Sequence, residues 1–187
     1  MSRRLRSGLT VIETLVVCTL LGLLTTGMVM VFASYGRHAR ITQMRRDYID
    51  QAQKGMVRLE QEMSNSSSTY LSIGTNYVIF PSAQTSLATG LVLNSEGKLM
   101  WQRWICYAVD TATSEFWRGE TTIATPAATP GTAPALTAFS KSRKRLSYPG
   151  LSLSVAAGTA GGLYVVTLKV GDKTNQVSIT SQIGVRN

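Results

Sequence analysis

Apolar residues dominate one continuous segment near the beginning of the chain. Residues 9–33 have the sequence LTVIETLVVCTLLGLLTTGMVMVFA and contain a single charged side chain, Glu13. A helix of roughly 20 apolar residues crosses the hydrocarbon core of a bilayer. The segment is therefore long enough to span a membrane as one helix.

A second helical pattern follows without a break over residues 34–63. Apolar side chains recur at every third or fourth position and draw one stripe along a helix. The stripe consists of Ile41, Met44, Tyr48, Ala52, Met56, Leu59 and Met63. The opposite face places opposite charges four residues apart, namely Arg46 with Asp50, Asp50 with Lys54, and Arg58 with Glu62. We predict one helix over residues 9–63, with its first half in a membrane and the stripe of its second half packed against a sheet.

Beyond residue 68 the hydrophobic period changes to two, which is typical of strands. We predict strands over residues 77–80, 91–93, 99–109, 115–123, 151–155, 164–170 and 177–185. Residues 99–109 are apolar on both faces, as in a central strand, whereas residues 177–185 alternate as in a half-buried antiparallel strand. The predicted fold class is α+β, a long helix packed on an antiparallel sheet over residues 64–187.

Residues 121–150 interrupt the strand pattern. They carry four of the five prolines, followed by a basic run that consists of Lys141, Arg143, Lys144 and Arg145. The Pro-Ala-Thr composition predicts an extended surface loop. A basic run is usually a solvated loop tip. The alternatives are contact with a polyanion such as DNA, or with an acidic partner or lipid headgroups.

Composition argues against several kinds of site. The 187 residues include one histidine, His38, and two cysteines, Cys18 and Cys106. A catalytic Ser-His-Asp or Cys-His set would depend on His38 alone, and metal centres usually gather Cys and His at short spacing. We therefore predict no enzyme activity, no metal and no cofactor. We expect Cys106 to be a small buried core residue, with intermolecular pairing as the alternative.

The charge distribution does not orient the apolar segment. Lys and Arg total 19 against 10 acidic residues, a formal net charge of +9. Basic residues mark the cytoplasmic side of a membrane helix, and Arg3, Arg4 and Arg6 precede the segment. Arg37 and Arg40 follow it just as closely.

Two simple interpretations of the apolar segment leave something unexplained. A cleaved secretory signal, with a site at Val31-Phe32-Ala33 and a mature chain starting at Ser34, would have an apolar core of only about 7 to 15 residues. A plain membrane anchor fits the length but leaves Glu13 without a partner. A carboxylate at the centre of a membrane helix costs about 2.5 to 3.5 kcal/mol, and less nearer the interface.

A third interpretation rests on a resemblance. MSRRLRSG followed by LTVIETLVV resembles the prepilin signature of type IV pilins and type II secretion pseudopilins. In that family a short basic leader ends in Gly, and a Phe-Thr-Leu-Ile-Glu-Leu-Leu-Val-Val type of sequence opens a long apolar helix. Gly8 ends the leader, Leu9 replaces the usual Phe, and Thr14 stands where Leu is common. Six of the nine positions match: Thr10, Ile12, Glu13, Leu15, Val16 and Val17.

The resemblance implies a processed membrane protein with a pilin-like fold. Residues 1–8 would be a leader that a prepilin peptidase removes between Gly8 and Leu9, with N-methylation of Leu9. Glu13 would then pair with the amino terminus of a neighbouring subunit during filament assembly. The implied partners are the peptidase, the inner (cytoplasmic) membrane, and other major and minor pilins or pseudopilins. The domain after the helix would lie outside the cytoplasm.

Two looser patterns narrow the function that the resemblance implies. Residues 104–109 followed by residues 115–118 are similar to a hairpin of pseudopilin J and PilW-type minor pilins, and the final Arg186-Asn187 is similar to the end of many of those chains. We expect a minor subunit that helps initiate or cap a type IV pilus or a type II secretion pseudopilus. The alternative is a membrane-tethered adhesin or DNA-binding minor pilin that acts through residues 121–150.

Overall fold

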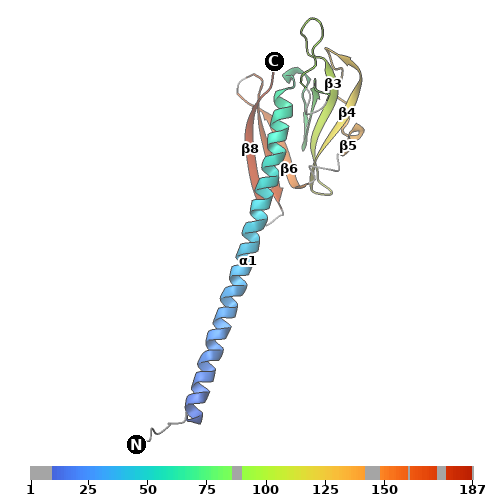
Figure 1. The fold of residues 1–187 in the computed structure, drawn as a ribbon. Helices are drawn as coiled ribbons and strands as arrows, with labels where there is room; N and C mark the ends of the chain where they lie inside the picture. Colours follow the sequence, from blue (N-terminus) through green and yellow to red (C-terminus); the bar gives the residue numbers. More distant parts are fainter. Residues whose placement is uncertain (1–9, 86–89, 142–147, 160, 172–175, 187) are drawn as a thin grey trace, which may run out of the picture. The chain divides into compact units, whose positions relative to one another are not determined.

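The computed structural model describes residues 10–85, 90–141, 148–159, 161–171 and 176–186 (Figure 1). Helix α1 spans Val11–Ser64, close to the predicted bounds. The chain divides into two compact units, one ending at Met44 and the other starting at Arg45. Each unit is described by itself.

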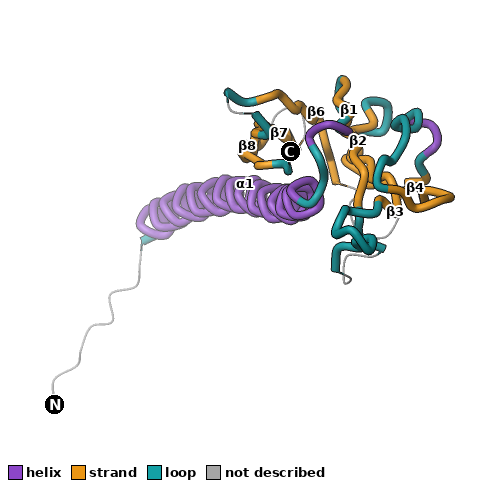
Figure 2. Tube along the Cα trace, turned by 90° about the horizontal axis from the view of Figure 1, so that it is seen from above, coloured by secondary structure: helices purple, strands orange, loops and turns teal. Residues whose placement is uncertain are grey.

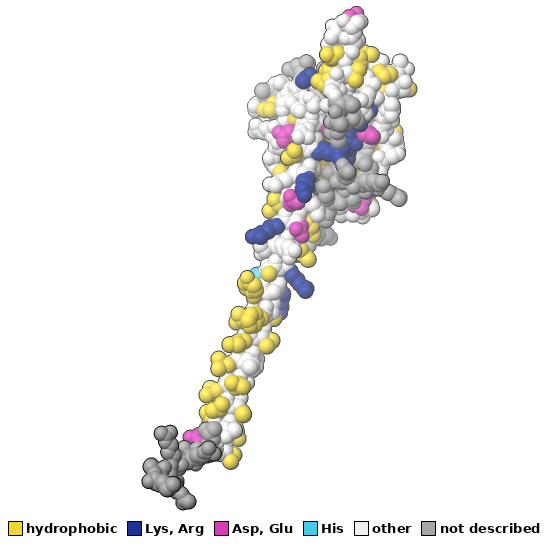
Figure 3. Space-filling view, in the orientation of Figure 1, with side chains coloured by type: hydrophobic (Ala, Val, Ile, Leu, Met, Phe, Trp, Pro, Cys, Tyr) yellow, Lys and Arg dark blue, Asp and Glu magenta, His cyan; other side chains and the backbone are white. Residues whose placement is uncertain are grey.

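The first unit is the amino-terminal part of α1, and its apolar side chains are exposed (Figure 3). Its threonine hydroxyls donate to carbonyl groups of the preceding turn. Thr19 Oγ1 lies 2.8 Å from the carbonyl oxygen of Val16, and Thr25 Oγ1 lies 3.0 Å from that of Gly22. Each hydroxyl therefore has a hydrogen-bond acceptor within the helix, which a polar group needs where no water is present. This part of α1 is long and apolar enough to cross a membrane, and is compatible with a membrane anchor.

The second unit combines the rest of α1 with antiparallel strands, which confirms the α+β class. Strands β1 to β5 form one group, and β6 to β8 form a three-stranded group (Figure 2). Strand β6 joins the two groups by pairing with the start of β4. The strands are β1 (Ser72–Gly74), β2 (Tyr77–Ser82), β3 (Trp101–Asp110), β4 (Glu115–Ala127), β5 (Ser140–Lys141), β6 (Tyr148–Ala157), β7 (Leu163–Gly171) and β8 (Gln176–Gly184). Two short 3-10 helices, Ser68–Tyr70 and Leu136–Ala138, lie between them.

The main core lies between α1 and one face of the strands. Ala52, Met56, Leu59 and Met63 of the predicted stripe are buried there, and Tyr48 packs at the margin. They meet apolar side chains of β2, β3, β4, β6, β7 and β8, among them Phe80, Ile105, Phe116, Leu153, Leu168 and Ile183. The prediction was wrong for the first two stripe residues, Ile41 and Met44, which are exposed. Both residues belong to the first unit, whereas the strands belong to the second.

A smaller core covers the other face of β2, β3 and β4. It gathers Ile79, Trp104, Cys106, Ala108, Trp117 and Phe139. Cys106 is fully buried and forms no disulfide, which confirms its prediction as a core side chain.

The predicted loop over residues 121–150 overlaps the predicted strand over residues 115–123, and the structure confirms the strand and extends it beyond residue 123. Residues 121–127 continue β4, which runs to Ala127. The following segment is tied back to the strands, since the indole Nε1 of Trp101 donates to the carbonyl oxygen of Ala128 over 2.9 Å. Thr121 Oγ1 donates to the carbonyl oxygen of Ala138 over 3.1 Å, and Phe139 is buried. The proline-rich segment therefore covers the outer apolar face of the sheet.

The predicted strand over residues 91–93 was also wrong. The structure has only an isolated bridge there, between Leu93 and Leu99. Between them the Asn94 side chain accepts from the backbone N–H groups of Glu96 and Lys98, and Gly97 has a φ of 75°. Asn94 and Gly97 therefore form a tight turn, and the chain reverses before residues 91–93 can pair as a strand.

Candidate functional site

The carboxylate of Glu13 closes a capping box at the start of α1. The backbone N–H of Thr10 donates to Glu13 Oε2 over 2.9 Å, and the backbone N–H of Glu13 donates to Thr10 Oγ1 over 3.3 Å. This reciprocal pair satisfies two N–H groups that a helix start leaves without intrahelical partners. The Thr-x-x-Glu spacing of residues 10–13 is the sequence signature of this box, although none of the predictions above rests on it. Gly8 and Leu9, the residues of the predicted cleavage and methylation site, lie outside the described residues.

One residue of the predicted basic run is already paired within the chain. Lys141 Nζ donates to Asp110 Oδ2 and lies 5.8 Å from the centre of the Trp117 ring. Lys141 and the backbone N–H groups of Ala112 and Thr113 hold the pKa of Asp110 at about 2. The ion pair of Lys141 with Asp110 thus links β5 to the end of β3. Arg143, Lys144 and Arg145 lie outside the described residues, so DNA contact through the basic run stays a prediction.

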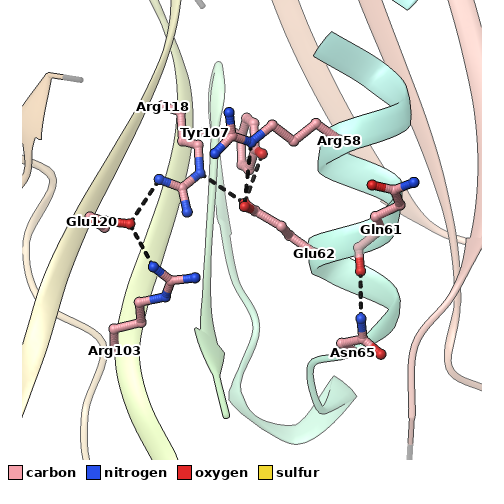
Figure 4. A network of polar contacts seen from close by, with 8 residues as sticks. All are labelled: Arg58, Gln61, Glu62, Asn65, Arg103, Tyr107, Arg118 and Glu120. Carbon is pink, nitrogen blue, oxygen red and sulfur yellow. Dashed lines mark hydrogen bonds and ion pairs between the residues drawn. The ribbon is translucent and has the colours of Figure 1, made fainter. Parts of the chain in front are cut away.

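A network of buried charges joins α1 to β3 and β4 (Figure 4). We call the side chains of Arg58, Glu62, Arg103, Tyr107, Arg118 and Glu120 the buried charge network. Figure 4 shows Glu62 extending from α1 toward Tyr107 and Arg118, which come from the two neighbouring strands. Tyr107 stands opposite Arg118 in the β3–β4 ladder. The register of that ladder therefore brings both side chains to the same place.

Glu62 is the acceptor at the centre of this network. Its Oε2 accepts from Tyr107 Oη over 2.8 Å and from Arg118 Nε over 2.9 Å, while Arg58 Nε lies 3.5 Å from Oε1. The side chain of Glu62 is 1% exposed and that of Arg118 is 5% exposed. The placement of Glu62 on the polar face of the helix was wrong, although its predicted pairing with Arg58 is present.

The burial of Glu62 is consistent with the helical period of the buried side of α1. The buried positions of α1 are Ala52, Gly55, Met56, Leu59, Glu62 and Met63, which follow spacings of three and four residues. Gly55 and Glu62, seven residues apart, form a second row beside the apolar stripe. Hydrophobic periodicity does not reveal this row, because Gly55 and Glu62 are not apolar side chains.

Burial and charge shift the pKa values of Tyr107 and Arg118, the two donors to Glu62 Oε2. Burial, and then the charge and hydrogen bond of Glu62, raise the pKa of Tyr107 far above its usual range, so its phenol stays protonated. Burial lowers the pKa of Arg118, but its hydrogen bond and charge interaction with Glu62 outweigh burial and raise it. The pair therefore consists of a guanidinium cation and a carboxylate that also accepts from a neutral phenol.

The network extends outward through Glu120. Its Oε2 accepts from Arg118 Nη1 and from Arg103 Nη1, both over 2.9 Å. Burial raises the pKa of Glu120, but the hydrogen bond from Arg118 and the charges of the arginines outweigh burial and lower it. Glu120 is about half exposed. The network therefore runs from the interior to the surface of the second unit.

The described residues offer no ready metal centre. Among residues 10–85, 90–141, 148–159, 161–171 and 176–186, no three His, Cys, Asp or Glu side chains are grouped as metal ligands. His38 lies on α1 within the first unit.

The buried charge network can hold charge and bind an anion, because its guanidinium groups are cations with several donors each.

Comparison of the chain with protein-family models, with curated proteins and with solved structures finds no significant match.

Proposed function

We propose that this chain is a pilin-like subunit, a minor pilin or pseudopilin that helps initiate or cap a type IV pilus or a type II secretion pseudopilus. The observation that carries the proposal is Glu13. It is the one charged residue in the apolar part of α1 over residues 11–33, whose large apolar side chains are exposed along the helix. A helix of this kind needs lipid or neighbouring helices around it, and its carboxylate needs a partner there.

The capping box leaves Glu13 able to take a second, cationic partner. The backbone N–H and the hydroxyl of Thr10 both donate to Oε2, and neither of these bonds reaches Oε1. The ammonium group of a neighbouring subunit, freed by cleavage between Gly8 and Leu9, would add a charge-assisted hydrogen bond. The amino-terminal end of the helix dipole also favours a carboxylate at this place. Because an unpaired carboxylate is costly in an apolar environment, a subunit with a free amine is preferred during assembly.

The test is the intact mass and the amino-terminal sequence of the protein purified from its native membranes. We expect a chain that begins at N-methylated Leu9. A variant with a bulky residue in place of Gly8 is the matched control, and we expect it to keep residues 1–8. A wild-type chain that begins at Met1 or Ser2 would contradict the proposal and indicate an uncleaved anchor. A chain that begins at Ser34 would contradict it and indicate a secreted protein.

A further inference from the structure

The buried charge network holds more positive than negative charge. Within the described part of the chain, Arg58, Arg103 and Arg118 pair with two carboxylates, Glu62 and Glu120. Single ions are costly to bury unless they are paired. The network therefore has an excess of one positive charge, and one further monovalent anion would neutralise it.

The network also holds hydrogen-bond donors that no described residue accepts. Arg103 uses Nη1 for Glu120, whereas its Nε and Nη2 have no acceptor within the described part of the chain. Arg118 Nη2 is also buried without an acceptor among the described residues. The Nε–H and Nη2–H bonds of a guanidinium form a planar fork, which matches the two oxygens of a carboxylate. The Arg103 side chain is 10% exposed, so bulk water has little access to these N–H groups as an acceptor.

A small cavity lies beside this arginine. Its volume is about 170 Å³, and it is lined by Thr85, Gln102, Arg103, Glu120 and Thr122. A water molecule occupies roughly 30 Å³ of liquid, so the cavity can hold a carboxylate group with a few waters, but not a large ligand. The described lining residues are all polar, and Gln102, Arg103 and the two threonines can donate hydrogen bonds to an anion, whereas Glu120 limits the negative charge that the cavity accepts.

We propose that this cavity binds a carboxylate group through Arg103. Arg103 Nε and Nη2 are closed to solvent, so binding requires Arg103 to turn its Nε–Nη2 edge toward the cavity. Glu120 then keeps its hydrogen bond from Arg118 and loses the one from Arg103 Nη1. A carboxylate fits better than a phosphate, because a second negative charge would be repelled by Glu120 and exceed the single excess positive charge. The ligand is either a small free acid or an Asp or Glu side chain of a partner protein.

The test uses the full chain in detergent micelles with ¹⁵N-labelled arginine. The Nε–H signal of Arg103 is followed by NMR during titration with sodium acetate, against sodium chloride at the same ionic strength. We expect a saturable shift with acetate and none with chloride. A parallel titration uses a short uncharged peptide that contains one Asp, with its Asn counterpart as control. Saturation by acetate alone assigns the site to small acids, and saturation by the Asp peptide as well assigns it to a partner side chain.

Three variants show whether Arg103 carries the binding. Arg103→Lys lacks the planar fork, and we expect its acetate affinity, followed by the backbone amide signal of Thr122, to fall roughly tenfold. Thr122→Leu fills the exposed wall of the cavity without removing a charge, and we expect it to abolish the Arg103 shift. Arg46→Lys, at an exposed arginine of α1 outside the network, is the matched control and should bind within about twofold of wild type. The proposal is overturned if acetate and chloride act alike, or if Thr122→Leu binds as well as wild type.

Discussion

Glu62 of α1 and Arg118 of β4 form a nearly solvent-free ion pair, with 2.9 Å between Oε2 and Nε. They are 56 residues apart in the chain. Because α1 meets the strands mainly through apolar side chains, this pair and the hydrogen bond from Tyr107 to Glu62 are directional contacts in a mostly non-directional interface. Together they fix which turn of the helix lies over which strand.

Removing one partner of this pair is expected to destabilise the second unit strongly. Glu62→Ala leaves the buried Arg118 without its main acceptor, and loss of one member of a buried pair costs about 3 to 5 kcal/mol of unfolding free energy. Denaturant unfolding of the full chain, followed by tryptophan fluorescence, measures the effect. Asp50→Ala, which removes the exposed pair with Lys54, is the control and should change the free energy by less than about 1 kcal/mol. Equal effects of the two variants would contradict the role of Glu62.

Replacing both partners is expected to cost less than the single changes together. In Glu62→Leu/Arg118→Leu no charge of the pair stays buried alone, so the double variant should be more stable than the sum of the two single variants predicts. The same unfolding measurement provides the double-mutant cycle. Strict additivity would show that the two side chains do not interact in solution.

Tyr107→Phe isolates the hydrogen bond of the phenol. The ring keeps its stacking between Phe80 and Phe116, while Glu62 loses one donor. We expect a loss of about 1 to 2 kcal/mol in unfolding free energy at pH 7. The raised pKa of Tyr107 adds a pH dependence. Above the ordinary tyrosine pKa near 10, only the unfolded chain loses this proton, so wild type should lose stability as pH rises further and the variant should lose less.

Acid is expected to weaken the contacts of Asp110 and Glu120. Both carboxyl groups have lowered pKa values in the folded protein, that of Asp110 being about 2. The unfolded chain binds their protons first, so their contribution is complete above the ordinary pKa values and is lost as pH falls through the folded ones. Thermal unfolding between pH 5 and about pH 2 should show a shallower decline for Asp110→Asn than for wild type. Identical pH profiles would exclude the Lys141 pair as a contributor.

Cys106 is expected to be inert in the folded protein. Burial raises the pKa of its thiol to about 12, so almost no thiolate is present at neutral pH. In a Cys18→Ser variant, a thiol reagent should label no cysteine under native conditions and one after unfolding. Rapid labelling of the native variant would show that the outer core opens.

Glu13 is expected to matter for assembly rather than for processing. If the proposed function is right, Glu13→Leu is still cleaved after Gly8, but enters filaments or supports secretion far less than wild type. Thr10→Val removes the hydroxyl bonds of the capping box while leaving the carboxylate in place, and serves as the matched control. Electron microscopy or a secretion assay in the native host gives the readout. Normal assembly of Glu13→Leu would contradict the proposed role of Glu13.

The amino-acid sequence by itself determined the elements that depend on neighbouring residues. The uninterrupted apolar run of residues 9–33 and the three-to-four-residue period of residues 34–63 together specify one helix, since side chains three and four residues apart share one face. The alternation within β7 and β8 specifies strands for the same kind of local reason. The membrane-length helix could be predicted in this way, and the burial of Cys106 from the usual burial of free cysteine side chains.

Only the tertiary structure decided where Glu62, Arg103 and Arg118 meet. The helical period places Glu62 at the border of the apolar stripe, where either burial or exposure is compatible with the pattern. Its burial depends on Tyr107 and Arg118, which lie 45 and 56 residues further along the chain and face each other through the β3–β4 register. A charge enters a core only where such distant partners offset its desolvation, and local periodicity holds no information about them.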